Sequence, residues 1–174
     1  FNPGAADTYN NRGIAYQDMG DYEQAFTDFN RAIALNPKLA GGYISRANAY
    51  QDLNGYEQAI VDYDQAIALN PTDANAYNNR GVAYEALGDY GQSITDFNQA
   101  LDINPQLAEA YTNRGNVYQD MGEYDKAIVD YNQAIVLDPD NAETYYNRGN
   151  AYADLGENKQ AIDDYDHAIA LDPE

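Results

Sequence analysis

The amino-acid sequence predicts an all-α solenoid built from five stacked helix–turn–helix units. The first observation is a 34-residue period that runs through the chain without insertions. The second is that every period holds two stretches of helical hydrophobic spacing, separated by a turn signal and closed by a proline. A fixed period of this length is typical of repeat proteins, in which one unit cannot bury its apolar face alone. The five units span residues 6–39, 40–73, 74–107, 108–141 and 142–174.

Positions within a unit are numbered from 1 to 34, so that position 1 is Ala6 in the first unit. Positions 3, 4, 7, 8, 10, 11 and 14 fall on one side of a helix, and all except position 7 are aromatic, aliphatic, small or an occasional threonine. Glycine at position 15 or 16 then breaks this helix, and a second apolar arc follows it. Asn-Pro or Asp-Pro ends the second helix, because the residue before proline is disfavoured in helical conformation. In the first unit we expect helices near residues 7–19 and 23–35.

Several positions are uniform in all five units. Positions 4 and 11 are tyrosine, positions 8 and 20 are small, position 24 is phenylalanine or tyrosine, position 27 is alanine and position 32 is proline. This pattern resembles the tetratricopeptide repeat (TPR) family over residues 6–174, and the Asn11-Arg12-Gly13 triplet resembles a TPR subclass common in microbial proteins. The resemblance implies a right-handed α-solenoid that forms one elongated domain over residues 1–174. Residues 1–5 match positions 30–34, so we expect the tail of a preceding repeat, from a longer array or from a design made without caps.

Composition argues against several classes of function. The net charge is −20 with only nine Lys and Arg residues, which disfavours nucleic acid. The chain has no cysteine, and no apolar run approaches membrane-spanning length, so we expect neither a disulfide framework nor a membrane partner. The segment shows no targeting signal, which favours the cytoplasm. His167 is the only histidine, and Ser45 and Ser93 are the only serines, so no Ser-His-Asp site is available and we expect no enzyme, metal or cofactor.

Position 7 is arginine in every unit, although it lies within the packing arc, where leucine is commonest in the TPR pattern. Position 23, at the edge of the second apolar arc, is aspartate in every unit. In an antiparallel hairpin that turns at positions 15–16 these two positions are near neighbours. Because a partly buried charge needs a partner, we interpret them as structural ion pairs rather than a ligand site. The residues are Arg12, Arg46, Arg80, Arg114 and Arg148, with Asp28, Asp62, Asp96, Asp130 and Asp164.

The face opposite the packing arc of the first helix comprises positions 2, 5, 6, 9, 12 and 13. In TPR arrays this face lines the concave groove where partners bind, and the position-6 asparagines resemble the asparagine ladder of certain long TPR superhelices. No Lys or Arg falls at these positions, so the family's clamp for C-terminal carboxylates is not implied. A merely solvated helix face is the alternative. The candidate groove residues are Asn11, Asn48, Asn79, Asn113, Asn116, Asn147, Asn150, Asp18, Asp52, Glu85, Asp120 and Asp154.

The predicted function is therefore a protein–protein interaction scaffold that binds an extended, basic or neutral peptide in the groove. The alternative is a structural role, in which the repeats act as a spacer or assemble end to end. The first helix of the first unit and the second helix of the last unit should expose apolar surface that internal units bury. End-to-end self-association of the chain is therefore also expected.

Overall fold

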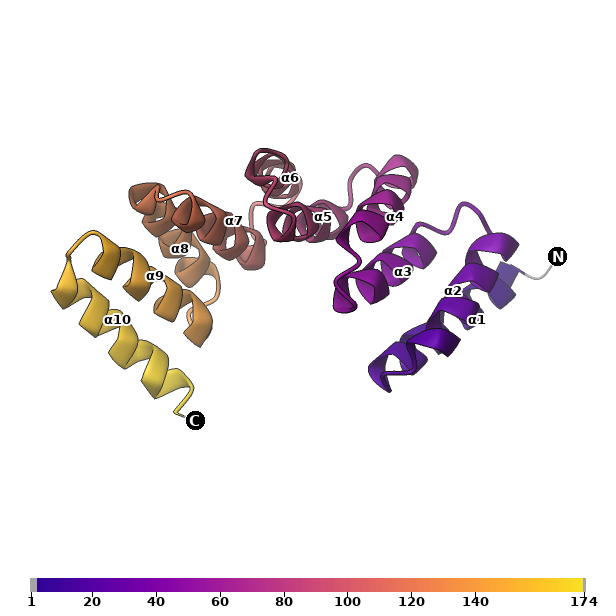
Figure 1. Ribbon diagram of the computed structural model, residues 1–174, viewed down its shortest axis with the longest axis horizontal. Coiled ribbons are helices and arrows are strands. Elements are labelled where there is room, and N and C mark those ends of the chain that lie inside the picture. The colour runs from indigo at the N-terminus through magenta and orange to yellow at the C-terminus, as the bar shows by residue number, and fades with distance from the viewer. Residues whose placement is uncertain (1–2, 174) are drawn as a thin grey trace. The chain divides into compact units, whose positions relative to one another are not determined.

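The computed structural model describes residues 3–173, and these residues form ten helices joined by short turns (Figure 1). The chain divides into two compact units that are each larger than one 34-residue repeat, with the boundary between Asp89 and Tyr90, inside the third repeat. Below, 'unit' means one of these two parts and 'repeat' means one 34-residue period. The first contains α1 (Pro3–Asp18), α2 (Tyr22–Leu35), α3 (Ala40–Asp52), α4 (Tyr56–Leu69) and α5 (Ala74–Ala86). The second contains α6 (Tyr90–Ile103), α7 (Ala108–Asp120), α8 (Tyr124–Leu137), α9 (Ala142–Asp154) and α10 (Asn158–Leu171).

The first helix of the chain begins earlier than the sequence predicts. α1 starts at Pro3 rather than near residue 7, and it is 16 residues long, against 13 residues for α3. Pro3 and Gly4 are helical, whereas the equivalent Pro37 and Lys38 form a turn between α2 and α3. Proline suits the first turn of a helix, because its backbone angle is already helical and its missing N–H has no partner there.

The turn between the two helices of a repeat requires a left-handed backbone. Gly20, Gly88, Gly122 and Gly156 adopt φ angles of 73–80° at repeat position 15, where glycine carries no steric penalty. In the second repeat the same position is Asn54, with a φ of 59°. Asparagine is among the few other residues that tolerate this conformation, so the second turn keeps the geometry of the others.

Consecutive helices pack against each other within each unit, and the core lies between them. The ring at position 24 is fully buried in Phe29, Tyr63, Phe97 and Tyr131. In the first unit, Phe29 packs between Ala25 of its own helix and Ala49 of the next repeat. A Cβ atom built on Gly13 would lie 2.5 Å from the Phe29 ring, which is closer than a real Cβ atom comes without moving the ring, so glycine here lets the two helices approach.

None of the helices within residues 3–173 is both long enough and apolar enough to cross a membrane.

Candidate functional site

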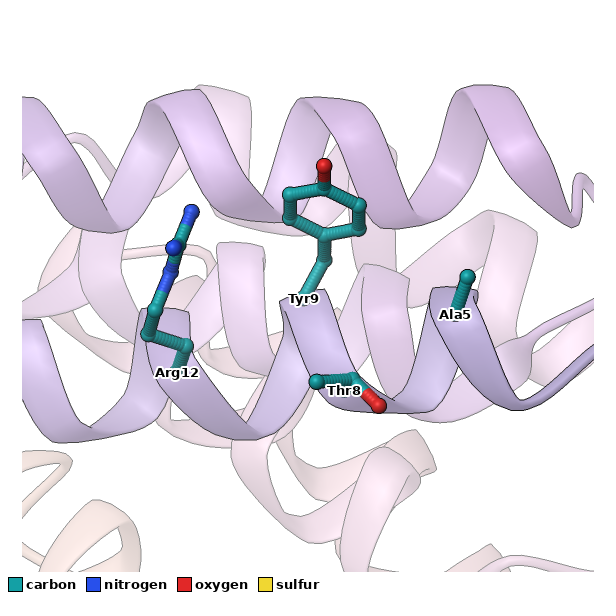
Figure 2. A pocket seen from close by; sticks show the side chains of 4 residues that line it. All are labelled: Ala5, Thr8, Tyr9 and Arg12. Carbon is teal, nitrogen blue, oxygen red and sulfur yellow. The ribbon is translucent and has the colours of Figure 1, made fainter.

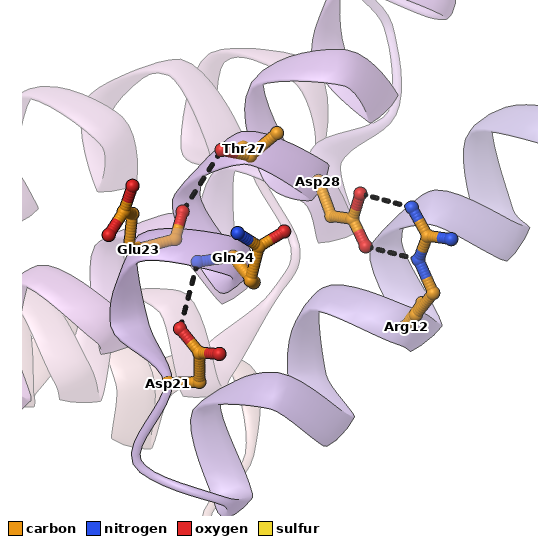
Figure 3. Close-up of polar contacts among 6 residues, drawn as sticks. All are labelled: Arg12, Asp21, Glu23, Gln24, Thr27 and Asp28. Atoms are coloured by element: carbon orange, nitrogen blue, oxygen red, sulfur yellow. Dashed lines mark hydrogen bonds and ion pairs between the residues drawn. The ribbon is translucent and has the colours of Figure 1, made fainter.

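The structure brings together the arginine of position 7 and the aspartate of position 23 in the four repeats that lie within a single unit. Arg12 on α1 donates from Nε to Asp28 Oδ2 at 2.6 Å and from Nη2 to Asp28 Oδ1 at 2.7 Å (Figure 3). This two-bond geometry matches the planar guanidinium to both carboxylate oxygens. The same arrangement, at 2.6–2.7 Å, joins Arg46 to Asp62, Arg114 to Asp130 and Arg148 to Asp164.

The aspartates of these pairs are buried, with side chains only 4–7% exposed. The hydrogen bond to its aspartate raises the pKa of each of Arg46, Arg114 and Arg148, against a smaller lowering by burial. The arginine therefore supplies the charge that a buried carboxylate requires. Arg80 and Asp96 belong to different units, and their pairing stays a prediction.

Each arginine after the first also contacts the preceding repeat, through a residue that the sequence analysis did not select. Arg46 Nη1 donates to Asn30 Oδ1 at 2.6 Å, and Arg148 Nη1 donates to Asn132 Oδ1 at 2.6 Å. Arg114 bonds Asn98 in the same way at 2.5 Å, and Arg80 forms an ion pair with Asp64. The partner always stands at position 25, so the arginine ties its own hairpin to the helix before it. The sequence contained a signal for this contact, because position 25 is asparagine or aspartate in every repeat: Asn30, Asp64, Asn98, Asn132 and Asp166.

Tyrosines flank the same guanidinium groups. The guanidinium carbon of Arg114 lies 5.6 Å from the ring centroid of Tyr111, and that of Arg148 lies 5.6 Å from Tyr145 and 5.9 Å from Tyr152. These distances fall within the range of cation–π attraction. The tyrosines of positions 4 and 11 therefore pack against the arginine as well as against the core.

The position-9 asparagines of the candidate groove are held by tyrosine hydroxyls from position 24. Tyr63 Oη donates to Asn48 Oδ1 at 2.6 Å, and Asn79 Nδ2 donates to the same oxygen at 3.3 Å. Burial raises the pKa of Tyr63, against a smaller lowering by the Asn79 amide, so the hydroxyl remains a donor. Since the Asn48 oxygen already accepts two hydrogen bonds, its amide N–H groups are what it can offer to a ligand.

The second unit repeats this cluster on α7, α8 and α9. Tyr131 Oη donates to Asn116 Oδ1 at 2.8 Å, and Asn147 Nδ2 donates to the same oxygen at 3.0 Å. Tyr165 Oη donates to Asn150 Oδ1 at 2.9 Å. On the candidate groove face, a position-9 asparagine is thus linked to the position-6 asparagine of the next repeat in each unit, and Asn116, Asn147 and Asn150 stay half-exposed.

The remaining groove candidates lie near the surface. Asn11 is exposed and Asn113 is half-exposed. Asp52 accepts hydrogen bonds from Gln17 Nε2 at 2.7 Å and from Tyr22 Oη at 3.3 Å, which ties the first two repeats together. Asp120 accepts one from Tyr90 Oη at 3.4 Å. The candidate carboxylates Asp18, Asp52, Asp120 and Asp154 are exposed, and Glu85 is half-exposed.

The assignment of position 5 to the groove face was wrong. Asn78 is 1% exposed and Thr112 is 7% exposed. Thr112 Oγ1 lies 3.0 Å from Thr144 Oγ1, which stands at position 3 of the next repeat. At position 5, the first helix of a repeat therefore contacts the first helix of the next repeat. This neighbour comes in addition to its own hairpin partner and the second helix of the preceding repeat.

The structure shows the surroundings of the single histidine. His167 stacks on Tyr145 with ring centroids 5.3 Å apart, and its Nδ1 lies 2.9 Å from the backbone oxygen of Asp163. Within residues 3–173, no group of three or more His, Asp or Glu side chains is arranged to hold a metal ion.

Comparison with known proteins defines the class of this chain. A family model described as TPR repeat matches residues 47–88, 86–122 and 118–156, and one described as Tetratricopeptide repeat matches residues 6–39 and 142–174. The chain belongs to the tetratricopeptide repeat family, whose fold is that of a protein-interaction scaffold. The predicted family and the all-α solenoid of helix–turn–helix units are thereby confirmed. None of the curated proteins compared with the chain matches it significantly.

Several solved structures share the fold. A crystal structure of MamA is 26% identical, with a TM-score of 0.82 over 92% of this chain and 94% of that one. TTC0263, a thermophilic TPR protein of Thermus thermophilus, is 26% identical, with a TM-score of 0.81 over 98% of this chain and 93% of that one. YrrB, described as a TPR protein with an unusual peptide-binding site, is 23% identical, with a TM-score of 0.73 over 95% of this chain and 86% of that one. At that identity YrrB shares the fold alone.

Proposed function

We propose that this chain is a non-catalytic scaffold whose groove face binds an extended peptide of basic or neutral character. The observation that supports this proposal is the row of linked asparagine amides on successive first helices, flanked by exposed carboxylates. In the second unit the row comprises Asn116, Asn147 and Asn150. Asp120 and Asp154 flank it, and both are exposed. A peptide partner is favoured over nucleic acid, since the chain carries a net charge of −20.

The amides would hold the peptide backbone, and the carboxylates would select its side chains. An extended chain offers alternating N–H and C=O groups, and a primary amide can meet either. The Asn116 oxygen is already engaged by Tyr131 and Asn147, so its N–H groups would meet a peptide carbonyl. The carboxylates would attract Lys or Arg on the ligand and disfavour acidic segments.

The charge contribution to affinity should be small. The carboxylates are exposed, so each pair with a ligand cation should contribute at most about 1 kcal/mol. Salt screens such pairs beyond roughly 8–10 Å at physiological ionic strength. Binding should therefore be weak to moderate and should decline gradually as salt rises.

Isothermal titration with extended peptides of matched length, one cationic, one neutral and one acidic, tests the proposal. The cationic and neutral peptides should bind at a defined stoichiometry and the acidic peptide should not. Asn147→Ala should weaken binding at constant salt, because it removes an amide and no charge. Asn158→Ala is the matched control, since Asn158 is an exposed asparagine outside the groove. Equal binding of the acidic peptide, or equal affinity in the two variants, would exclude the proposed groove.

A further inference from the structure

A hydrogen-bonded pair of asparagines decides which polar groups the groove face of the second unit presents. Asn116 Oδ1, on α7, accepts from Tyr131 Oη at 2.8 Å and from Asn147 Nδ2, on α9, at 3.0 Å. These two bonds occupy both lone pairs of the oxygen, so Asn116 presents only N–H donors. Asn147 has given one N–H to Asn116 and presents its oxygen and one further N–H. Within residues 3–173, neither the N–H groups of Asn116 nor the oxygen of Asn147 has a partner, and both side chains are half-exposed.

The first unit holds an equivalent pair with the same polarity. Asn48 Oδ1, on α3, accepts from Tyr63 Oη at 2.6 Å and from Asn79 Nδ2, on α5, at 3.3 Å. The Asn79 oxygen accepts from Asn78 Nδ2 at 3.3 Å and keeps a second lone pair. In each unit, therefore, the donors lie at position 9 of one repeat and the acceptor lies at position 6 of the next.

Tyr131 is the residue that positions the pair in the second unit. Its side chain is fully buried, and its hydroxyl lies closer to Asn116 Oδ1, at 2.8 Å, than to Gln119 Oε1, at 3.1 Å. A hydroxyl proton directed at Asn116 holds the oxygen of that amide toward the core and leaves its N–H groups for other partners. Asn147 can then bond the Asn116 oxygen only as a donor. A core residue thus determines which asparagine of the pair offers the acceptor.

We propose that these amide pairs fix the direction of the bound peptide, with its N-terminal end toward the later repeat and its C-terminal end toward the earlier one. This inference rests on the proposed peptide-binding function of the groove face. In an extended chain the N–H and C=O of one residue point to the same side, and the N–H comes first along the chain. One ligand residue can therefore donate its N–H to Asn147 Oδ1 and accept at its C=O from Asn116 Nδ2.

The reversed peptide loses both of these bonds. Its N–H would face the N–H groups of Asn116, and its C=O would face the Asn147 oxygen. Two lost hydrogen bonds, together with the repulsion between like groups, predict a preference of roughly tenfold or more for one direction. The preference does not depend on the ligand's side chains, because both bonds involve only its backbone.

A blocked, lysine-containing peptide with a palindromic sequence tests direction alone, since its side chains read the same from either end. A nitroxide spin label is attached to its N-terminal end in one sample and to its C-terminal end in another. The label broadens the NMR signals of nearby backbone amides of the full chain. In the second unit the N-terminal label should broaden α9 more than α7, and the C-terminal label should do the reverse. In the first unit α5 and α3 should show the same two patterns.

Tyr131→Phe tests the positioning role of the hydroxyl. Phe29 and Phe97 are fully buried at the same repeat position, so the variant should fold. Without the hydroxyl proton the Asn116 amide can turn over, and the directional preference of the second unit should fall to roughly threefold or less. The first unit keeps Tyr63, so its preference should stay unchanged and serves as an internal control.

Tyr111→Phe is the matched control variant on α7. Tyr111 lies beside the guanidinium of Arg114 at 5.6 Å, as Tyr9 lies beside that of Arg12 at 5.4 Å (Figure 2), away from the groove face. This variant should keep the full preference. Equal broadening by the two labels, the opposite pattern, or equal preferences in Tyr131→Phe and Tyr111→Phe would overturn the inference while the groove itself stands. A palindromic peptide that does not bind at all would refute the proposed groove, and this inference with it.

Discussion

Removal of Arg114 should destabilise the chain more than a surface ion pair would suggest. The side chain of Asp130 is 6% exposed, and its two oxygens accept hydrogen bonds from Arg114 at 2.7 Å each. Arg114→Ala leaves this carboxylate buried without a cation, which should cost about 3–5 kcal/mol. Asp130→Ala should cost less, because Arg114 keeps its bond to Asn98 and is 18% exposed, so that it reaches solvent.

The double variant separates the free energy that the ion pair contributes from the cost of leaving one buried charge without a partner. Replacing both residues with apolar side chains removes the buried charge, so it should cost much less than the sum of the single changes. The coupling energy should be about 2 kcal/mol. The measurement is urea denaturation followed by far-ultraviolet circular dichroism, with the slope checked for each variant. Arg114→Lys, which keeps the charge but loses the two-bond geometry, should fall between wild type and Arg114→Ala.

The first repeat supplies an internal control for this reasoning. Arg12 makes the same two bonds to Asp28, but its side chain is 57% exposed and, among residues 3–173, it has no bond to a preceding repeat. Arg12→Ala should therefore destabilise the chain less than Arg114→Ala. A coupling energy below about 0.5 kcal/mol for Arg114 and Asp130 would show that the carboxylate is solvated or neutral, and would refute the argument.

Three further predictions follow from single positions. Asn54→Gly should raise the free energy of unfolding by up to about 1 kcal/mol in urea denaturation, since glycine bears a φ of 59° without penalty; a loss of stability would contradict this. Gly115→Ala should lower stability by about 1–3 kcal/mol, because a Cβ atom there would lie 2.6 Å from Cε1 of the buried Tyr131 ring, and Gly115→Leu should cost more; a neutral Gly115→Ala would be inconsistent with the close approach of the ring. Because burial raises the pKa of Tyr63, the contribution of its protonated hydroxyl to the free energy of unfolding should be complete below pH about 10 and decline as pH rises further. Tyr63→Phe should flatten the fall of the free energy of unfolding above this pH. An unchanged fall would show that other groups cause it.

The sequence was sufficient for the fold because the signals were local and repeated. Glycine at the turn and proline after the second helix define each hairpin without reference to its neighbours. The meeting of Arg114 and Asp130 was also predictable, because residues at complementary distances from one turn must face each other. The uniform Asn or Asp at position 25 marks Asn98 as a candidate, but its bond to Arg114 could not be assigned from the sequence, since it depends on how one hairpin lies against the preceding one.

The wrong assignment of position 5 has the same physical cause. A helical wheel divides a helix into one packing face and one solvent face, and the sequence prediction treated the first helix of each repeat in this way. In the structure α7 contacts α6, α8 and α9, so part of its presumed solvent face is buried. Thr112 lies on that part, against Thr144. The pattern within one hairpin carries no information about this third neighbour.

The tyrosine hydroxyls of position 24 show what a combined analysis of two positions can add. Position 9 is asparagine in the three repeats where position 24 is tyrosine, and aliphatic in the two where position 24 is phenylalanine. The buried hydroxyls of Tyr63 and Tyr131 need acceptors, which Asn48 and Asn116 supply together with Gln51 and Gln119. The asparagines of the groove face are therefore partly a consequence of core composition. The oxygens of Asn48 and Asn116 serve the fold, and only the N–H groups of these two side chains remain for a ligand. This helix face presents donors where the core has tyrosine and an apolar side chain where it has phenylalanine, so the choice of ring at position 24 sets the polarity of the surface above it.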